Sequence, residues 1–170
     1  MLLVVDMQNG FITDASKHIV AVVKELVEFF DKQNSPVVFT RFVNKPDSPF
    51  VKWGEHADFM SEPENAIISE LKPYVNIVFE KTQYSAFTDE VTLFIQEKNI
   101  KRIFICGIAT NYCILKTAVD AFEKNIQPIV IEDACASFKS KKVHEQALEF
   151  ISGYIGPKQI IKSKELLIWN

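Results

Sequence analysis

Six short apolar runs, separated by longer amphipathic stretches, constrain most strongly how this chain can fold. The runs cover residues 2–5, 36–42, 76–80, 102–107, 127–132 and 159–161. They are apolar throughout, which is typical of strands that are covered on both faces. Strands alternating with helical segments predict an α/β fold, a three-layer sandwich with a central, mainly parallel six-stranded sheet flanked by helices.

The stretches between these runs repeat apolar residues every three or four positions, as amphipathic helices do. The pattern predicts helices over 17–32, 89–98, 111–124 and 141–152, and a shorter one over 64–71 that ends before Pro73. Thr88 or Asp89 is the expected cap of the second helix. Residues 43–63 form one long connection without this period, and a loop of such length often forms part of a site. The 170 residues, with no linker or repeat, predict a single domain over 1–170.

Composition excludes several classes of protein. The formal charge is -3 and no basic block occurs, so we expect no nucleic-acid partner. No apolar run reaches the roughly 18 residues that span a bilayer, and the start lacks the charged segment of a signal peptide. The three cysteines contain no CxxC pair, which argues against a disulfide framework or a zinc site and for reduced thiols in a cytoplasmic protein.

Two charged side chains follow predicted strands, at the edge where a parallel sheet binds its ligands. Asp6 ends the first strand and Lys81 ends the third. Each has a structural alternative: Asp6 as a cap near Asn9, and Lys81 as a solvated surface lysine. A buried ammonium is costly without an acidic partner, and strand ends of one sheet could bring such groups together.

Cys113 follows the fourth strand, where the next predicted helix begins. In the first turn of a helix, free N–H groups and the dipole favour an anion, so the sequence predicts a lowered thiol pKa. The alternative is a small core residue, which suits Cys106 in mid-strand, while Cys135 is ambiguous. An acid, an amine and a thiol at three strand ends can act together as proton carrier, electrostatic partner and nucleophile.

Four segments resemble the isochorismatase-like cysteine hydrolases, a family that includes nicotinamidases and N-carbamoylsarcosine amidase. They are VVDMQNGF, EKTQYSAF, GIATNYC and VIEDACAS. The resemblance implies a Rossmann-like fold and a hydrolase that cleaves the C–N bond of a small amide or N-carbamoyl compound through a thioester. It assigns catalytic roles to Asp6, Lys81 and Cys113, and places the aromatic Phe11 near them. It also implies a homo-oligomer, a dimer or larger.

The same resemblance implies a backbone arrangement beside the nucleophile. A cis peptide bond is expected between Ile108 and Ala109, turning the Ala109 N–H toward the site. Together with the N–H of Cys113 it would form an oxyanion hole, whose donors each typically contribute about 100- to 1,000-fold in rate.

One motif departs from the family pattern. Nicotinamidases carry an Asp-x-His after the second strand, where this sequence has Phe42 and Asn44. His56 is the one histidine in the following loop, and one histidine is too few for a zinc or iron site. We therefore expect no metal and no cofactor. Isochorismatases proper act on a vinyl ether and need no cysteine, so Cys113 favours amide chemistry.

Further substrate contacts are weaker expectations. Arg41 can pair with a substrate carboxylate or form a surface salt bridge. Trp53 and Tyr112 can line the pocket or pack at a subunit contact, and His56 is a loop residue that can contact substrate. The alternatives to the amidase are a metal-dependent nicotinamidase, an isochorismatase-type hydrolase, a non-catalytic relative, and a thiol redox enzyme using Cys113 with Cys135.

Overall fold

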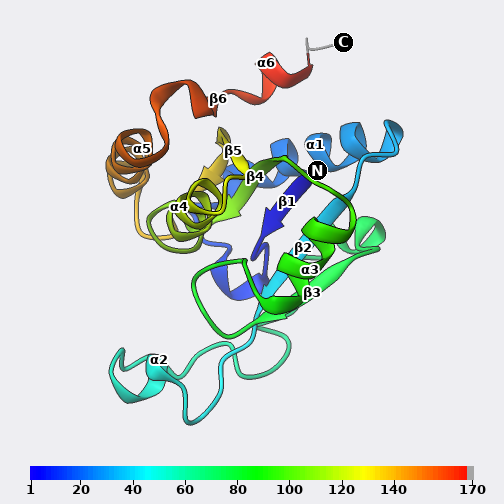
Figure 1. Cartoon of the computed structure of the whole chain (residues 1–170). Coiled ribbons are helices and arrows are strands. Elements are labelled where there is room, and N and C mark those ends of the chain that lie inside the picture. Colours follow the sequence, from blue (N-terminus) through cyan, green and yellow to red (C-terminus); the bar gives the residue numbers. More distant parts are fainter. Residues whose placement is uncertain (168–170) are drawn as a thin grey trace.

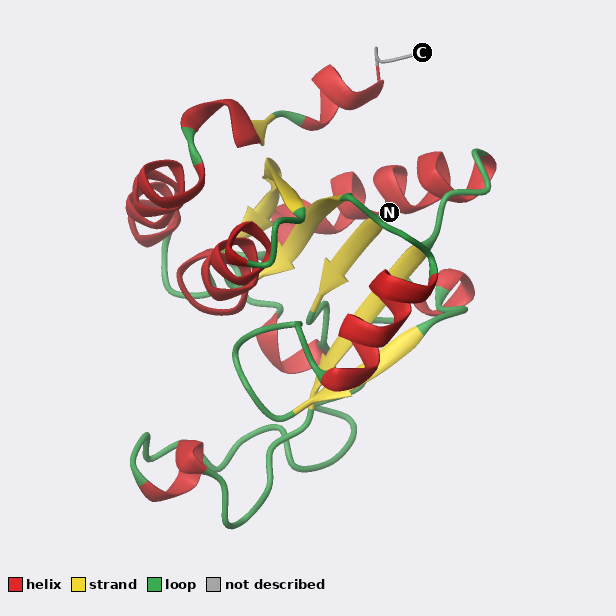
Figure 2. Ribbon diagram, viewed as in Figure 1, coloured by secondary structure: helices red, strands yellow, loops and turns green. Residues whose placement is uncertain are grey.

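Six parallel strands form one central sheet. The structure of the protein is a computed structural model that describes residues 1–167. The strand order across the sheet is β3-β2-β1-β4-β5-β6, and every pair is parallel (Figure 2). The strands are β1 (Leu2–Val5), β2 (Val37–Phe42), β3 (Val78–Lys81), β4 (Arg102–Ile108), β5 (Gln127–Ala136) and β6 (Ile160–Ile161).

Helices cover both faces of this sheet (Figure 1). They are α1 (Val20–Lys32), α2 (Pro49–Lys52), α3 (Asp89–Glu97), α4 (Leu115–Glu123), α5 (Lys141–Ile155) and α6 (Ser163–Leu167). Side chains of α1 and α6 pack against one face, and side chains of α3, α4 and α5 pack against the other. A hydrophobic core lies on each face of the sheet. Successive side chains of β1 pack alternately into one core and the other, so the strand is apolar throughout. The predicted three-layer α/β fold is confirmed.

Local signals set several helix boundaries. The side-chain oxygen of Thr88 accepts a hydrogen bond from the N–H of Val91 at 3.3 Å, so Thr88 is the cap of α3. Four one-turn 3-10 segments and one π-helical turn complete the helical structure of the described residues. They are Asn9–Phe11, Lys17–Ile19, Lys72–Tyr74, Pro157–Gln159 and the π turn Thr110–Ile114.

The predicted helix over residues 64–71 is wrong. Its apolar residues are buried, but the segment runs as turns beside the extension of β1. Ile67 forms an antiparallel bridge with Gln8, and the N–H of Ile68 donates to the carbonyl of Met7 at 3.0 Å. These long-range bonds use backbone groups that a helix would need, so tertiary contacts override the local period. Pro73 lies inside a 3-10 turn rather than beyond a helix end.

Gly107 allows the ends of β1 and β4 to approach closely. Its φ is +116°, and a Cβ atom there would lie 2.1 Å from the carbonyl oxygen of Val5. A side chain would therefore push the two strands apart. The sheet changes direction between β1 and β4, since β2 and β3 lie on one side of β1 and β4 to β6 on the other. Ligands of open α/β sheets bind outside such a switch point.

Candidate active site

The structure brings Asp6, Lys81 and Cys113 together at the carboxyl ends of three strands. The Lys81 Nζ atom lies 2.7 Å from Oδ2 of Asp6 and 3.3 Å from Sγ of Cys113. The exposed fractions of the three residues are 0%, 2% and 7% in sequence order. On its other oxygen, Asp6 accepts a hydrogen bond from the Thr40 hydroxyl at 2.8 Å. The acid, amine and thiol thus form one buried cluster.

The ammonium of Lys81 is fixed by four contacts. It donates to the carbonyl oxygens of Gln83 and Tyr84 at 2.8 and 3.2 Å, and to the sulfur of Cys113. Asp6 Oδ2 stays an ion-pair neighbour at 2.7 Å but accepts no hydrogen bond of good geometry among the described residues. A buried carboxylate oxygen without a directed donor is able to accept a proton from a nearby thiol.

Charge interactions keep the cluster in a defined protonation state. Burial alone would lower the pKa of Lys81, but Asp6 and Cys113 raise it above its ordinary value, so the amine stays charged. Burial raises the pKa of Cys113 and Asp6 raises it further, while Lys81 lowers it, with a net value of about 12. The sequence prediction of a lowered thiol pKa is wrong because desolvation and the neighbouring carboxylate outweigh the lysine. The resting group is a thiol beside a carboxylate.

Cys113 lies in the π-helical turn Thr110–Ile114 that links β4 to α4. The sequence prediction placed it in the first turn of an α-helix, but the regular helix begins only at Leu115. Five-residue π segments of this kind are rare and often occur at functional sites. The turn presents the sulfur to both Lys81 and the adjoining pocket.

The backbone before the turn is shaped by a cis peptide bond between Ile108 and Ala109. This is the bond at which the family resemblance implies one. The carbonyl of Ala109 accepts from the N–H groups of Tyr112 and Ile114, at 3.0 and 3.1 Å. The N–H of Ala109 donates to no other described residue, and Ala109 lines the same pocket as Cys113. A free backbone donor therefore lies next to the thiol.

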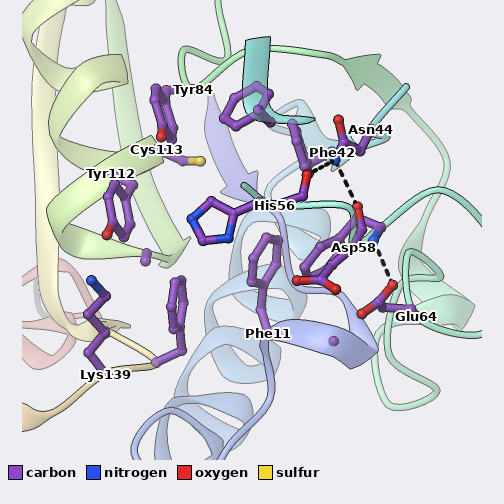
Figure 3. A pocket seen from close by; sticks show the side chains of 15 residues that line it. Phe11, Phe42, Asn44, His56, Asp58, Glu64, Tyr84, Tyr112, Cys113 and Lys139 are labelled. Atoms are coloured by element: carbon purple, nitrogen blue, oxygen red, sulfur yellow. Dashed lines mark hydrogen bonds between the residues drawn. The ribbon is translucent and has the colours of Figure 1, made fainter. Parts of the chain in front are cut away.

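A pocket of about 290 Å³ opens beside Cys113 (Figure 3). Most of its wall is aromatic. The residues that line it are Gly10, Phe11, Phe42, Asn44, Phe50, His56, Asp58, Phe59, Glu64, Tyr84, Ala109, Tyr112, Cys113, Phe138 and Lys139. Phe11 and Tyr112 lie where the sequence predicts them, in the pocket wall. The volume suits a small organic molecule.

Five of the rings form a continuous stack along this wall. Tyr84 stacks on Tyr112 with centroids 5.6 Å apart, Tyr112 on Phe138 at 5.9 Å, and Phe138 on Phe11 at 5.7 Å. Phe11 then meets Phe59 at 3.9 Å. Since the rings come from five separate segments of the chain, each supports the others, and the wall is largely preformed.

Residues 43–63, the loop without helical periodicity, supply Phe59 to this stack and also line the pocket with Asn44, Phe50, His56 and Asp58. Asn44 organises the loop: its Nδ2 donates to the carbonyls of His56 and Asp58 at 2.9 and 3.0 Å. Its Oδ1 accepts from the Ser48 hydroxyl at 2.6 Å and from the Lys45 N–H at 2.9 Å. In Figure 3 the His56 ring projects from this loop toward Cys113 and Tyr112. The sequence left the role of His56 open, and the structure places it in the pocket.

The residues after β2 do not fit a metal. Phe42 offers no ligand atom, and both polar atoms of Asn44 are used within the loop. Across residues 1–167, no three His, Cys, Asp or Glu side chains are grouped so that they could hold an ion.

Two predicted substrate contacts, Arg41 and Trp53, lie outside this pocket. Arg41 pairs with the carboxylate of Glu80 and lies 3.7 Å from that of Glu62, the surface salt bridge that was its alternative. Arg41 lies opposite Glu80 in the pairing of β2 with β3, so its guanidinium points toward β3. Trp53 follows α2 and is 82% exposed. Neither residue is carried into the proposed site.

The sequence interpretation missed most of the pocket wall. Four lining residues within the motifs were predicted, namely Phe11, Ala109, Tyr112 and Cys113, whereas loop and turn residues contribute most of the rest. The missed residues are Gly10, Phe50, Asp58, Phe59, Glu64, Tyr84, Phe138 and Lys139. A signal existed in the aromatic residues that follow the strands, since Tyr84 follows β3 and Phe138 follows β5. Phe50 and Phe59 lie in a loop without periodicity and gave none.

The other two thiols are buried in the sheet. Cys106 lies within β4 and Cys135 within β5, and all three cysteines are free. Burial raises the pKa of both. Within residues 1–167, no helix is both long and apolar enough to cross a membrane.

Comparison with known sequences places this geometry in a family context. A family model described as the isochorismatase domain matches residues 1–158. An uncharacterised isochorismatase family protein of Bacillus subtilis, YwoC, is 32% identical over 164 residues, covering 91% of this chain and 86% of the relative. Nicotinamidase 3 of Arabidopsis thaliana is 30% identical over 155 residues, covering 86% of this chain and 77% of the relative.

Solved structures share the fold. An isochorismatase-like hydrolase from Alkaliphilus metalliredigens superposes with a TM-score of 0.85 at 22% identity, covering 98% of this chain and 96% of that one. N-carbamoylsarcosine amidase from Thermoplasma acidophilum gives a TM-score of 0.81 at 25% identity, with 95% of each chain covered. The first likeness concerns the fold alone.

Proposed function

Because the chain belongs to the isochorismatase family, we propose that it is a cysteine hydrolase that cleaves the C–N bond of a small amide or N-carbamoyl compound. The observation that carries the proposal is the buried contact of Lys81 with both Asp6 and Cys113, at 2.7 and 3.3 Å. A binding protein has no need of a buried charge pair against a thiol, because burying such a pair is costly. A nucleophile needs both neighbours.

Attack begins from the thiol form. Asp6 accepts the proton of Cys113, and the sulfur adds to the carbonyl carbon of an amide held in the aromatic pocket. The charged amine of Lys81 stabilises the thiolate as it forms, since its raised pKa keeps it protonated. The N–H groups of Ala109 and Cys113 donate to the oxyanion. Each such donor typically contributes about 100- to 1,000-fold in rate.

Release and hydrolysis complete the cycle. The tetrahedral intermediate collapses as Asp6 gives its proton to the leaving nitrogen, which departs as ammonia or an amine. The acyl group stays on Cys113 as a thioester. Asp6 then takes a proton from water, the resulting hydroxide attacks the thioester, and the thiol is restored with its proton. One carboxylate thus serves both half-reactions as base and acid.

The other candidate functions fit the residues of the site less well. A metal-dependent nicotinamidase lacks ligands at Phe42 and Asn44, and an isochorismatase-type hydrolase would leave Cys113 unused. A redox pair with Cys135 is disfavoured because that thiol is buried in β5 with its pKa raised. We also propose that residues 1–170 act as one domain, in a cytoplasmic homo-oligomer, on a small-molecule amide.

The test is ammonia release from a panel of small amides that includes nicotinamide and N-carbamoyl compounds. We expect wild type to release ammonia from at least one, and Cys113→Ala to release none. Cys106→Ala removes a buried thiol of β4 that does not line the pocket, and it should keep the activity. Activity that survives in Cys113→Ala, or is absent from wild type across the panel, contradicts the proposal.

A further inference from the structure

A polar pair behind the pocket ties α5 to the turn that carries Cys113. Thr110 Oγ1 and His144 Nδ1 lie 2.8 Å apart. Thr110 is completely buried, and within residues 1–167 its hydroxyl has no other hydrogen-bond partner. His144 is half-buried and lies in the first turns of α5, which starts at the cap Ser140. The bond joins residues 34 positions apart, so it connects two elements that the sequence separates.

Thr110 occupies the position between the two groups that the reaction uses. It follows Ala109, whose N–H is a proposed oxyanion donor, and begins the π turn that contains Cys113. The backbone hydrogen bonds of the turn run to the carbonyls of Ala109, Thr110 and Tyr112, so they hold the turn together without fixing it to other elements. The hydrogen bond between the Thr110 side chain and His144 fixes the turn to α5. Breaking that contact would leave a buried hydroxyl unpaired, which is unfavourable.

We propose that His144 is a positioning residue for the hydrolase reaction, acting through Thr110 to fix the segment from Ala109 to Cys113. The inference rests on the proposed function. His144 is absent from the pocket wall, so it touches no substrate and takes no part in the chemistry. Its effect is on geometry: the distance from sulfur to Lys81 and the aim of the oxyanion donors. Misplacement by about an ångström at such groups is enough to slow a reaction markedly.

The surroundings of His144 suit this role. Burial lowers its pKa, as do His18 beside α1 and Lys141, while Glu132 on β5 and Glu145 raise it, and the net shift is downward. The imidazole is therefore neutral at pH 7. A neutral ring nitrogen either donates or accepts, and the hydroxyl of Thr110 matches either state. The pair stays satisfied without any charge being buried.

Two variants that remove the bond test the inference, with two that retain it. Thr110→Val and His144→Leu keep the volume and delete the polar atoms, while Thr110→Ser and His144→Asn keep a hydrogen-bonding group. We expect the first two to lower kcat about three- to tenfold, the range of one net hydrogen bond, with KM changed less than about twofold. The retaining variants should recover most of kcat. Gln146→Ala, an exposed neighbour on α5, is the control.

The double variant gives a sharper result. If the two side chains act through one bond, Thr110→Val/His144→Leu is no slower than the slower single variant. Additive losses, or a kcat equal to wild type in both folded single variants, overturn the inference. Melting temperatures establish that each variant is folded, and the Thr110 variants carry the test if His144→Leu is not.

A readout without substrate separates this inference from the proposed function. The rate of Cys113 alkylation by iodoacetamide at a fixed pH reports the contact of the sulfur with Lys81. We expect it to fall in Thr110→Val and His144→Leu, and to stay near the wild-type rate in Thr110→Ser and Gln146→Ala. An unchanged or raised rate in the first two contradicts the inference. If wild type hydrolyses no amide, the proposed function fails and the alkylation rates still decide this point.

Discussion

The cluster of Asp6, Lys81 and Cys113 and the loop of residues 43–63 adjoin one pocket, but they are held in place in different ways. Asp6 follows β1, Lys81 ends β3 and Cys113 lies in the turn after β4, and all three are almost fully buried. The loop is mostly exposed and depends on a few side-chain hydrogen bonds, chiefly those of Asn44. Figure 1 shows the loop around α2 extending away from the body of the sheet.

Under the proposed function, we infer that the cluster carries the chemistry and the loop carries substrate recognition. A reacting group has to be fixed within a fraction of an ångström, and a packed strand end provides that accuracy. A substrate-contacting wall is free to vary, and loops carry such variation. Gln8, just after β1, holds the chain on both sides of the loop. Its side chain bonds the backbone of Phe42, which precedes the loop, and the carbonyl of Asn65, which follows it, at 2.7 to 2.8 Å. We expect changes at the strand ends to alter rate and folding, and changes in the loop to alter substrate affinity.

The largest effect is expected from Asp6→Asn. The change keeps the shape but removes the proton acceptor, so kcat should fall about 100- to 10,000-fold, the range of general acid–base catalysis. Thr40→Val is the matched control, because it deletes only a hydrogen bond to the same carboxylate. It should cost about tenfold or less. Single-turnover assays that find more than a tenth of the wild-type rate in Asp6→Asn would remove Asp6 from proton transfer.

Lys81→Met should lower the free energy of unfolding. It leaves the buried carboxylate of Asp6 without its partner, which typically costs about 3–5 kcal/mol in the free energy of unfolding. Urea denaturation measures the change. Lys32→Met, at an exposed lysine at the end of α1, should stay within about 0.5 kcal/mol. Equal effects of the two variants would show that the ion pair is not what holds the strand ends.

Alkaline pH should lower the stability of the folded protein through its three buried thiols. Burial raises the pKa of all three thiols above the ordinary value of 9.0, so the folded protein holds these protons more tightly than the unfolded chain. Their contribution to stability is complete below pH 9 and is lost as the pH rises above it, by about 1.4 kcal/mol per thiol for each pH unit. Urea midpoints between pH 8 and 10 measure this slope. Cys135→Ala should reduce the slope, and an unaltered slope would contradict the assignment.

Asn44→Ala tests the loop. Removing the side chain frees the carbonyls of His56 and Asp58, so the wall loses its fixed shape. KM for the best amide should rise about tenfold, which corresponds to about 1.4 kcal/mol, with a smaller change in kcat. Asn44→Asp keeps the acceptor and should be intermediate, while Asn76→Ala, at an exposed asparagine, should be neutral. A loss confined to kcat would contradict the inference that the loop acts on substrate affinity rather than on the rate.

The smallest effect is expected from Trp53→Ala. The side chain is 82% exposed and outside the pocket, so kcat/KM and the free energy of unfolding should change little, within about 0.5 kcal/mol for the latter. Steady-state kinetics and urea denaturation give both values. A larger loss that depends on protein concentration would identify Trp53 as a subunit contact, the role that the sequence left open.

The cluster of Asp6, Lys81 and Cys113 was predictable because the topology of the sheet brings residues that are distant in sequence together. Asp6, Lys81 and Cys113 each follow a recognisable apolar run, and parallel strands end at one edge. The thiol pKa was not predictable in the same way. A sequence shows that Cys113 is near a helix start, but it does not show that desolvation and Asp6 dominate there.

The remaining errors share a physical origin. The helix expected over residues 64–71 is replaced by turns whose backbone bonds run to the segment after β1. Two other features likewise depend on side chains that meet only after folding. They are the contact of Thr110 with His144 and the hydrogen bonds of the Asn44 side chain within the loop. Arg41 lies near the end of β2, and its ion pair with Glu80 directs the guanidinium toward β3 rather than into the pocket. Local periodicity carries no information on such long-range polar contacts.

The most direct test of the central claim is the mass of the protein during turnover. Rapid acid quenching of wild type with its best amide should show an adduct of the substrate's acyl group, and digestion should place it on Cys113. Cys113→Ala should form no adduct and release no ammonia. Turnover by wild type with no trapped adduct, together with full activity in Cys113→Ala, would contradict a thioester mechanism and remove Cys113 from the reaction.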